Sequence, residues 1–212
     1  MKVTINKSIY EKLKENHFLD LHYKKWDINT QQYIDISNEE KINFSIKMIN
    51  TEELNVNDKN TIKHLINVVA EWNSVNILSE SKDAKNRYQY ICNAINSSLL
   101  QEKKGLLIFY YANFLDENNP VVYGIGIFNV KTNEILFALS YPDSQYDRKN
   151  RSQGVIGLAG GNIINAMLIN AFEKLNIKKI TTNVISPKIQ DFLSKNLNIN
   201  KLKSCKLFNI NK

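Results

Sequence analysis

The glycines of this 212-residue chain are few and clustered. Four of the seven lie between residues 154 and 161, at Gly154, Gly157, Gly160 and Gly161. Glycine lets backbone N–H groups approach a ligand closely, because it has no side chain to hold the ligand away. Apolar residues at helical spacing follow the cluster, and a helix N-terminus attracts anions. The stretch therefore indicates a phosphate-binding strand-to-helix turn, with tight packing of a helix on a sheet as the alternative.

The basic charge of the chain is concentrated in the same region. The net charge is +7, and residues 142–212 hold 12 Lys and Arg against 4 Asp and Glu, whereas residues 1–141 hold 16 against 17. Three of these cations, Arg148, Lys149 and Arg151, directly precede the glycine cluster. A basic segment favours an anionic partner such as a nucleotide cofactor, RNA or an acidic protein. The alternative reading is that the lysines serve solubility alone.

The composition excludes several classes of protein. At 43% hydrophobic and 10% aromatic residues, the chain can bury a core. No apolar run approaches the roughly 20 residues of a membrane span, and the N-terminus lacks the apolar region of a secretory signal. Cys92 and Cys205 form neither a disulfide framework nor a zinc motif. We therefore expect a cytoplasmic protein with no membrane span and no metal site, with export by a route that needs no cleaved signal left open.

Hydrophobic periodicity predicts the elements of the first half of the chain. A capping box at Ser8 and Glu11 predicts a helix over 8–25, and a short strand is expected over 33–36. Alternating apolar residues predict a half-buried strand over 42–48, with Phe44, Ile46 and Met48 facing inward. Helical spacing predicts helices over 60–73, capped by Asp58 or Asn60, and over 81–101, with Gly105 as the C-cap of the second.

The second half reads as strands followed by alternating helices and strands. Short turns join three apolar runs, at 106–113, 121–130 and 135–141, which predicts an antiparallel meander. The glycine cluster then leads into a helix that includes Ile163, followed by a strand over 177–185, a helix over 187–197 and a strand over 202–210. Gly124 and Gly126 share one face of the second meander strand. That face is expected either to line a ligand channel or to receive a closely packed helix.

The order of these elements from residue 42 to 210 resembles that of the GNAT superfamily of N-acetyltransferases. The family's cofactor loop, Gln/Arg-x-x-Gly-x-Gly/Ala, lies between the fourth strand and the next helix. Arg151-x-x-Gly154 is similar to its first half, and Gly157-Leu158-Ala159 to its second. Counting back from the turn at Asn176 favours a third register, Ala159-x-Gly161. All three registers stay open at this point.

The resemblance implies an α/β (α+β) fold with a mixed, mostly antiparallel central sheet flanked by helices. Residues 1–41 would be a helical N-terminal extension and residues 42–212 the acyltransferase-like domain. The implied cosubstrate is acyl-coenzyme A, most simply acetyl-coenzyme A, with its pyrophosphate at the glycine turn and its pantetheine arm along 138–141. The residues expected to bind it are Leu139, Tyr141, Arg151, Gly154, Gly157, Ala159, Gly160, Gly161 and Asn162.

The chemistry of acyl transfer requires that the acceptor amine loses a proton and that the departing thiolate gains one. Candidates for these steps are Glu134, Tyr141 and Tyr123, which lie on or beside the meander strands. The segment 186–195 is similar to the family's last helix, and its Phe192 and Lys195 match the motif. Leu193 stands where many members place the tyrosine that protonates the thiolate.

The function implied by the resemblance is transfer of an acetyl group from acetyl-coenzyme A to an amine. The acceptor could belong to a protein, an aminoacyl-tRNA or a small molecule. The alternative is a catalytically inactive binding or effector module of this architecture, of a bacterial virulence or toxin type. An acyl-homoserine-lactone synthase ranks lower, because Arg87 is the only arginine in the first half of the chain. Direct nucleic-acid binding ranks lowest, since no platform of aromatic and basic residues is recognisable.

Overall fold

The computed structural model describes residues 3–41, 43–77, 107–116, 119–140, 156–182 and 187–196. The strands are β1 (Val3–Asn6), β2 (Lys24–Asp27), β3 (Gln32–Asp35), β4 (Phe44–Asn50), β5 (Leu107–Asp116), β6 (Asn119–Asn129), β7 (Glu134–Ser140), β8 (Ile156–Gly157) and β9 (Lys179–Thr182). The helices are α1 (Lys7–Glu15), α2 (Asn38–Lys41), α3 (Val56–Ile77), α5 (Ala159–Ile169) with its π-helical continuation η2 (Asn170–Lys174), and α6 (Pro187–Asn196). The predicted helix 81–101, the Gly105 cap and the strand 202–210 lie outside the described residues.

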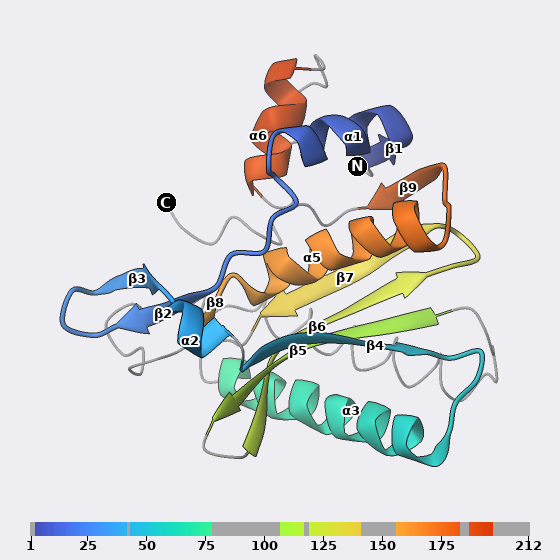
Figure 1. The fold of residues 1–212 in the computed structure, drawn as a ribbon. Helices are drawn as coiled ribbons and strands as arrows, with labels where there is room; N and C mark the ends of the chain where they lie inside the picture. Colours follow the sequence, from blue (N-terminus) through green and yellow to red (C-terminus); the bar gives the residue numbers. More distant parts are fainter. Residues whose placement is uncertain are drawn as a thin grey trace.

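Among the described residues, the central sheet has six strands in the order β1-β9-β7-β6-β5-β4 (Figure 1). β5, β6 and β7 pair antiparallel in succession, which confirms the predicted meander. β4 pairs antiparallel with β5 and forms one edge of the sheet. The predicted inward face of β4 is wrong at its far end, where Met48 is 46% exposed and Ile49 is buried. Ile49 packs into the cluster formed with α3, so the cover on this end of the edge strand comes from the α3 side.

β7 and β9 are the parallel pair of the sheet, and α5 is the crossover helix between them. Their register places Glu134 beside Thr181 and Ile135 beside Thr182. β1 then pairs antiparallel with the other side of β9, from Val3 opposite Thr182 to Asn6 opposite Lys179. The second edge of the central sheet is therefore supplied by the N-terminal residues.

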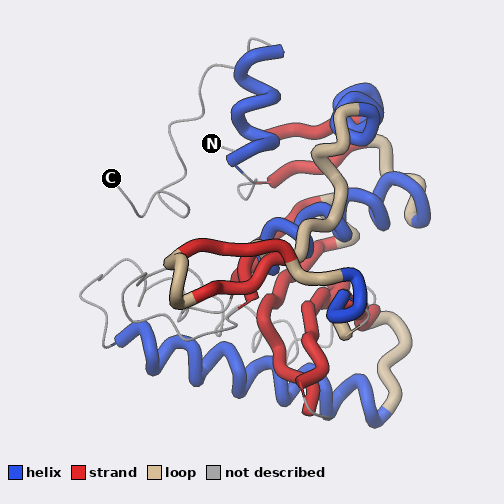
Figure 2. The backbone as a smooth tube through the Cα atoms, turned by 60° about the vertical axis from the view of Figure 1, so that its left-hand side comes forward, coloured by secondary structure: helices blue, strands red, loops and turns tan. Residues whose placement is uncertain are grey.

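The central sheet lies between two helices, α5 on one face and α3 on the other (Figures 1 and 2). The α3 stripe predicted from the sequence is buried at Ile62, Leu65, Val69 and Trp72. α5 is buried on nearly every side, because it also packs beneath the N-terminal segment. The α+β fold class with a mixed, mostly antiparallel sheet flanked by helices is confirmed.

Residues 3–41 contain strands as well as helices. β2 and β3 form a hairpin, and β8 pairs with β2 to complete a three-stranded sheet. The predicted helix over 8–25 is wrong beyond α1, which ends at Glu15. His17 has a left-handed backbone with φ of 58°, and the Phe18 N–H donates back to the Leu13 carbonyl at 2.9 Å. This hydrogen-bonded turn ends the helix and sends the chain across α5 towards β2.

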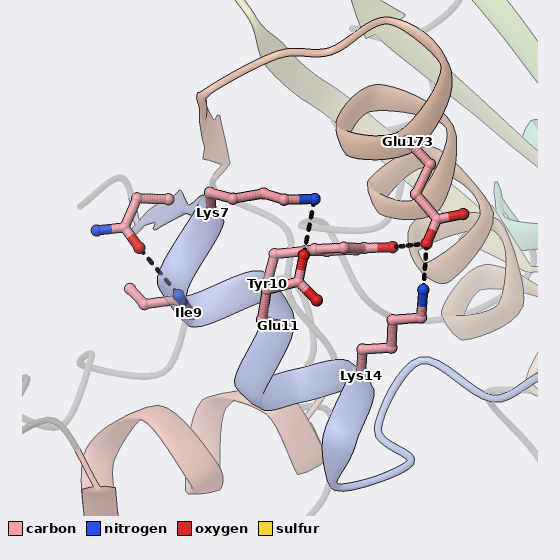
Figure 3. Close-up of polar contacts among 7 residues, drawn as sticks. Lys7, Ile9, Tyr10, Glu11, Lys14 and Glu173 are labelled. Carbon is pink, nitrogen blue, oxygen red and sulfur yellow. Dashed lines mark hydrogen bonds and ion pairs between the residues drawn. The ribbon is translucent and has the colours of Figure 1, made fainter.

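α1 is attached to η2, at the end of α5, by aromatic stacking and a shared carboxylate. The Tyr10 ring stacks on Phe172 with 4.6 Å between centroids. Its hydroxyl donates to Glu173 Oε1 at 2.7 Å, and Lys14 Nζ reaches the same oxygen at 2.6 Å (Figure 3). Both contacts lower the pKa of Glu173, with Lys14 the larger cause. Burial, followed by Glu173, raises the pKa of Tyr10 well above its usual range.

The helix caps differ from those predicted. Asn6 caps α1 by accepting from the Ile9 N–H at 2.9 Å, so the capping box at Ser8 and Glu11 is wrong. Glu11 instead pairs with Lys7 at 2.8 Å, one turn back along the helix. A reciprocal pair of hydrogen bonds does form at the start of α2, where Ser37 Oγ accepts from the Glu40 N–H and Glu40 accepts from Ser37.

The start of α3 shows the same reciprocal arrangement one turn earlier than expected. Asn55 Oδ1 accepts from the Asp58 N–H at 2.8 Å, and Asp58 Oδ2 accepts from the Asn55 N–H at 3.2 Å. The cap is therefore Asn55, and the predicted caps Asp58 and Asn60 both lie inside the helix.

Candidate functional site

The N-terminus of α5 lies against the carboxyl end of β7. The Gly160 N–H donates to Ser140 Oγ at 2.8 Å, and this hydrogen bond is buried. β8, which leads into the helix, pairs with β2, so Gly157 lies opposite Lys24 and Ile156 opposite Lys25. The end of β7, the start of α5 and the β2–β8 pair therefore meet at residues 156–161. We call these residues the glycine turn.

The first turn of α5 presents its positive end without an acidic side chain. The helix begins at Ala159, and Leu158 before it is left-handed with φ of 62° and makes no side-chain cap. Such a backbone is costly for leucine, which is nearly half exposed here. Of the first N–H groups, that of Gly160 is bonded to Ser140. The partial positive charge of the helix end suits an anion.

The glycines of this turn have three different surroundings. A Cβ on Gly157 would lie 2.6 Å from Tyr33 Cε1, so the tyrosine ring covers this residue. A Cβ on Gly160 would lie 2.9 Å from Ser140 Oγ. A Cβ on Gly161 would have nothing within 4 Å. Gly157 and Gly160 are thus required by packing within the protein, and Gly161 alone faces open space.

Gly124 and Gly126 are required by α5. A Cβ on Gly124 would lie 2.7 Å from Ile163 Cδ1 and 3.1 Å from the Leu139 carbonyl oxygen. A Cβ on Gly126 would collide with Met167 and lie 2.7 Å from Ile163 Cγ2. The helix therefore occupies the face of β6 that the two glycines share. Of the two expectations for this face, close helix packing is the one that the structure shows.

Asn162, expected to bind the cofactor, uses its side chain to hold the N-terminal segment. Its Oδ1 accepts from the His22 N–H at 3.0 Å, and its Nδ2 donates to the His22 carbonyl at 2.8 Å. One turn along the helix, Asn165 donates to the carbonyls of Phe18 and Asp20. Both side chains are buried, and together they fix the chain that crosses α5.

β7 and β9 pair in parallel from the first residue of β7. The ladder between them covers Glu134 and Ile135. The pairing of β7 with β6 skips Leu136, because Ile127 pairs with Phe137 and Phe128 with Ile135. An extra residue of this kind bends a strand and increases its twist. The bulge thus lies just beyond the residues of β7 that pair with Thr181 and Thr182, where the described part of β9 ends, and the rest of β7 runs on to Ser140 and the glycine turn.

The other expected site residues are spread along the sheet. Leu139 is buried near the end of β7, with its side chain towards α3, and Ala159 is buried in the α5 cluster. Glu134 is half-buried at the start of β7, about 20 Å from the glycine turn at roughly 3.3 Å per residue. Tyr123 is the extra residue of a second bulge, in β6, and its ring packs edge-on against Phe114. The remaining three lie outside the described residues: Tyr141, Arg151 and Gly154.

The sequence reasoning missed two lysines of β2 beside the glycine turn. Lys24 pairs with Asp35 at 3.4 Å, and Lys25 pairs with Glu40 at 2.5 Å. Lys25 is the main reason that the pKa of Glu40 is lowered. The two lysines were missed because residues 1–41 read as a separate extension, whereas β2 pairs directly with β8.

Leu193, which the resemblance aligned with a thiolate-protonating tyrosine, is a core residue. It is 1% exposed and lies with Ile189 in the same cluster as α5. Its neighbour Phe192 packs on Phe18 with 4.9 Å between ring centroids. α6 therefore buries an apolar face that includes Leu193.

Comparison of the chain with protein-family models, with curated proteins and with solved structures finds no match. Within the described residues, no group of three or more His, Cys, Asp or Glu side chains is placed to hold a metal ion. The helices in the same part of the chain include none with the length and apolar character that a membrane span requires.

Proposed function

We propose that this protein is a divergent GNAT-type acyltransferase that transfers an acetyl group from acetyl-coenzyme A to an amine. The observation that carries the proposal is the parallel pair of β7 and β9, in which β7 has a bulge at Leu136. The same strand, β7, ends at the glycine turn. A cosubstrate with a phosphate end and an extended, amide-containing arm fits this combination of an anion-attracting helix end and a bulged strand that leads to it.

Each part of the proposed site has a physical role. The N–H groups of the first turn of α5 would hold a phosphate, with Gly161 leaving room for it. Lys24 and Lys25, which are partly exposed beside the turn, would add positive charge. The backbone of β7 beyond Ile135 would pair with the amides of the arm, as one strand pairs with another.

In the proposed reaction the acceptor nitrogen attacks the thioester carbonyl carbon. The new C–N bond forms as the C–S bond breaks, the amine loses a proton to a base, and the thiolate takes a proton from an acid. Leu193 supplies no acid, since it is an apolar core residue. Tyr123, half-buried at the bulge of β6, is the described tyrosine nearest to the end of β7 among those expected to act, because Gly124 beside it pairs with Ser140.

The test places a negative charge at Gly161, the described glycine at which a Cβ would face open space. A Cβ at Gly161 has nothing within 4 Å, and an acidic residue in the first turn of a helix is favourable. We therefore expect this variant to fold while repelling a bound phosphate. Acetyl-coenzyme A at about 100 times its Kd stabilises a protein by about 2.7 kcal/mol. Thermal unfolding should show this rise for the wild type and not for Gly161→Glu.

Gly161→Ala is the matched control, because it fills the same position without charge and should keep most of the rise. No rise for the wild type would overturn the proposed function. An equal rise for the wild type and Gly161→Glu would contradict the placement of the phosphate at the glycine turn.

The burial of Leu193 favours a second candidate, a module that binds acyl-coenzyme A without turning it over. The two functions differ in product and not in binding. Release of the free coenzyme A thiol, measured with a panel of amines, distinguishes them. Stabilisation by acetyl-coenzyme A without amine-dependent thiol release would favour the binding module.

A further inference from the structure

The end of the central sheet away from the glycine turn carries three exposed lysines. Lys131 lies in the turn between β6 and β7, Lys178 directly precedes β9, and Lys179 begins it. The Thr181 N–H donates to the Asn133 carbonyl at 2.9 Å, which holds the two chain segments side by side (Figure 1). Lys131 and Lys179 each lie two residues before these bonded groups. The fold therefore brings lysines from separate segments to one end of the sheet.

The positive charge of these lysines is not neutralised within the described residues. None of the three forms an ion pair there, whereas Lys14, for example, is held by Glu173. Glu134 is the carboxylate that the register of β7 and β9 places beside Thr181, and it is half-buried. Three exposed cations accompany this one half-buried carboxylate, so this end of the sheet attracts anions.

The face of β1 and β9 that is turned away from α5 is polar and open beside these lysines. Its four residues are cross-strand neighbours, Thr4 with Thr181 and Asn6 with Lys179. The residues that alternate with them, such as Ile5, are buried in the α5 cluster, so these four point to the opposite side of the sheet. Thr181 is half-buried and the other three are exposed.

The composition of this face selects among anionic partners. Lysine, threonine and asparagine side chains are groups that bind the phosphates and sugars of nucleic acids. A protein partner would need apolar or aromatic anchors, and lysine is depleted at the core of protein interfaces. A single nucleic-acid strand would need aromatic rings on which its bases stack. The four residues of the face include neither kind of anchor, so a duplex recognised through its backbone fits best.

We propose that double-stranded RNA binds this surface, which we call the basic face: Thr4, Asn6, Lys131, Lys178, Lys179 and Thr181. The lysines would contact phosphates, and the threonines and Asn6 would contact 2′-hydroxyl groups, the contacts by which proteins recognise duplex RNA. The inference does not rest on the proposed function, because the glycine turn lies at the other end of β7.

The lysines are tested by fluorescence anisotropy of the full-length protein with an RNA duplex of about 20 base pairs, over a series of salt concentrations. The combined substitutions Lys131→Gln, Lys178→Gln and Lys179→Gln should weaken binding by about tenfold or more, and should reduce the slope of log K against log salt by about three. The control removes the same charge from three exposed lysines of β4 and α3, by Lys47→Gln, Lys59→Gln and Lys63→Gln. No binding by the wild type, or equal weakening in both triple variants, would overturn the proposal.

The sheet face is tested separately from the lysines by a negative charge at its centre. Thr4→Glu should weaken RNA binding, whereas Asn67→Glu, which adds the same charge on the exposed side of α3, should not. Thermal unfolding shows whether each variant is folded. Equal RNA affinities of Thr4→Glu and Asn67→Glu, with both folded, would remove β1 from the proposed surface and overturn it.

Two other polyanions decide whether RNA is the partner. A DNA duplex of the same sequence should bind more weakly, because it lacks the 2′-hydroxyl groups. Vesicles that contain phosphatidylserine present negative charge without sugars. Equal affinity for the DNA duplex, or lysine-dependent binding to the vesicles without binding to RNA, would overturn the proposal. The response to acetyl-coenzyme A should be unchanged in every variant of the basic face, so failure here leaves the proposed function standing.

Discussion

At the scale of single residues, the described glycines make room for different neighbouring groups. Gly124 and Gly126 let α5 pack closely on β6. Gly157 lets the ring of Tyr33 approach the backbone, and Gly160 does the same for the hydroxyl of Ser140. Gly161 has no neighbour within 4 Å of the position of a Cβ. Packing therefore explains each of these described glycines except Gly161, where we propose that a phosphate binds.

The packing of Gly124 gives a stability prediction. Gly124→Ala places a Cβ 2.7 Å from Ile163 Cδ1 and 3.1 Å from a backbone oxygen, and the backbone cannot easily move away. We expect a loss of about 1–3 kcal/mol in the free energy of unfolding, the usual cost of overpacking. Urea denaturation measures it. Gly161→Ala is the control, expected to be neutral or stabilising by up to about 1 kcal/mol because alanine favours the helix. Equal effects of the two substitutions would contradict the packing argument.

The importance of the glycines could be predicted from their scarcity, but their individual roles could not. The ring that lies beside Gly157 belongs to Tyr33, in a hairpin more than 100 residues away in the chain, and no local pattern predicts that contact. Asn162 shows the same limit. A polar residue in the first turn of a helix reads as a ligand contact, whereas its partner is the backbone of His22.

At the scale of elements, α1 is held to the end of α5 by a polar contact that depends on charge. The π-helical turn η2 ends α5, and the Leu175 N–H donates to the Asn170 carbonyl at 3.0 Å across the wider turn. Glu173 in this turn meets both Tyr10 and Lys14 of α1. Because two chain segments remote in sequence share one carboxylate, its ionisation bears on their docking.

The lowered pKa of Glu173 predicts how this docking depends on pH. A carboxyl whose pKa is lower in the folded state stabilises the fold at pH values above its unfolded pKa, about 4.3. That stabilisation is lost as the pH falls through the lower, folded pKa. Glu173→Gln should therefore have a lower Tm than the wild type at pH 7 and the same Tm in strong acid. The difference should be small, because Glu173 is exposed to solvent.

Thermal unfolding of both proteins over a series of pH values measures the difference. Glu11→Gln is the control, because Glu11 pairs with Lys7 within α1 and joins no two elements. A Tm difference for Glu173→Gln that persists in acid would show that the carboxylate charge is not its cause.

The boundaries of elements could be predicted where the hydrophobic pattern was strong. They could not be predicted reliably where several neighbouring residues could each cap the same helix. The meander followed from three apolar runs with polar turns between them, and the structure confirms it. The motif Ser-x-x-Glu occurs both at Ser8 and at Ser37, and reciprocal capping forms at Ser37. At Ser8 the strand β1 runs directly into α1, so Asn6 is the residue that keeps an extended backbone and caps the helix.

At the scale of the whole molecule, the N-terminal residues complete the sheet and the core. β1 covers the outer edge of β9, and β2 pairs with β8 beside the glycine turn. The sequence suggested an extension because the resemblance begins at residue 42. A strand of four residues is too short for its alternating pattern to be recognised in the sequence. The pairing of β1 with β9 could not be predicted either, because it joins residues that lie far apart in the chain.

This integration predicts that residues 42–212 do not fold alone. Deletion of residues 1–41 would uncover the edge of β9. It would also expose the apolar surface that now packs against seven buried side chains of the deleted segment: Val3, Ile5, Tyr10, Leu13, Leu19, Trp26 and Ile36. Each large buried side chain contributes about 1.5–3 kcal/mol, and domains are stable by only about 5–15 kcal/mol in all. Circular dichroism and amide NMR of the truncated chain should show loss of cooperative unfolding and of dispersed resonances. Adding residues 1–41 as a separate peptide should restore part of both, because β1 and α1 dock on surfaces that the rest of the chain provides. A truncated chain that unfolds cooperatively at the Tm of the full chain would contradict this and make residues 1–41 an appendage.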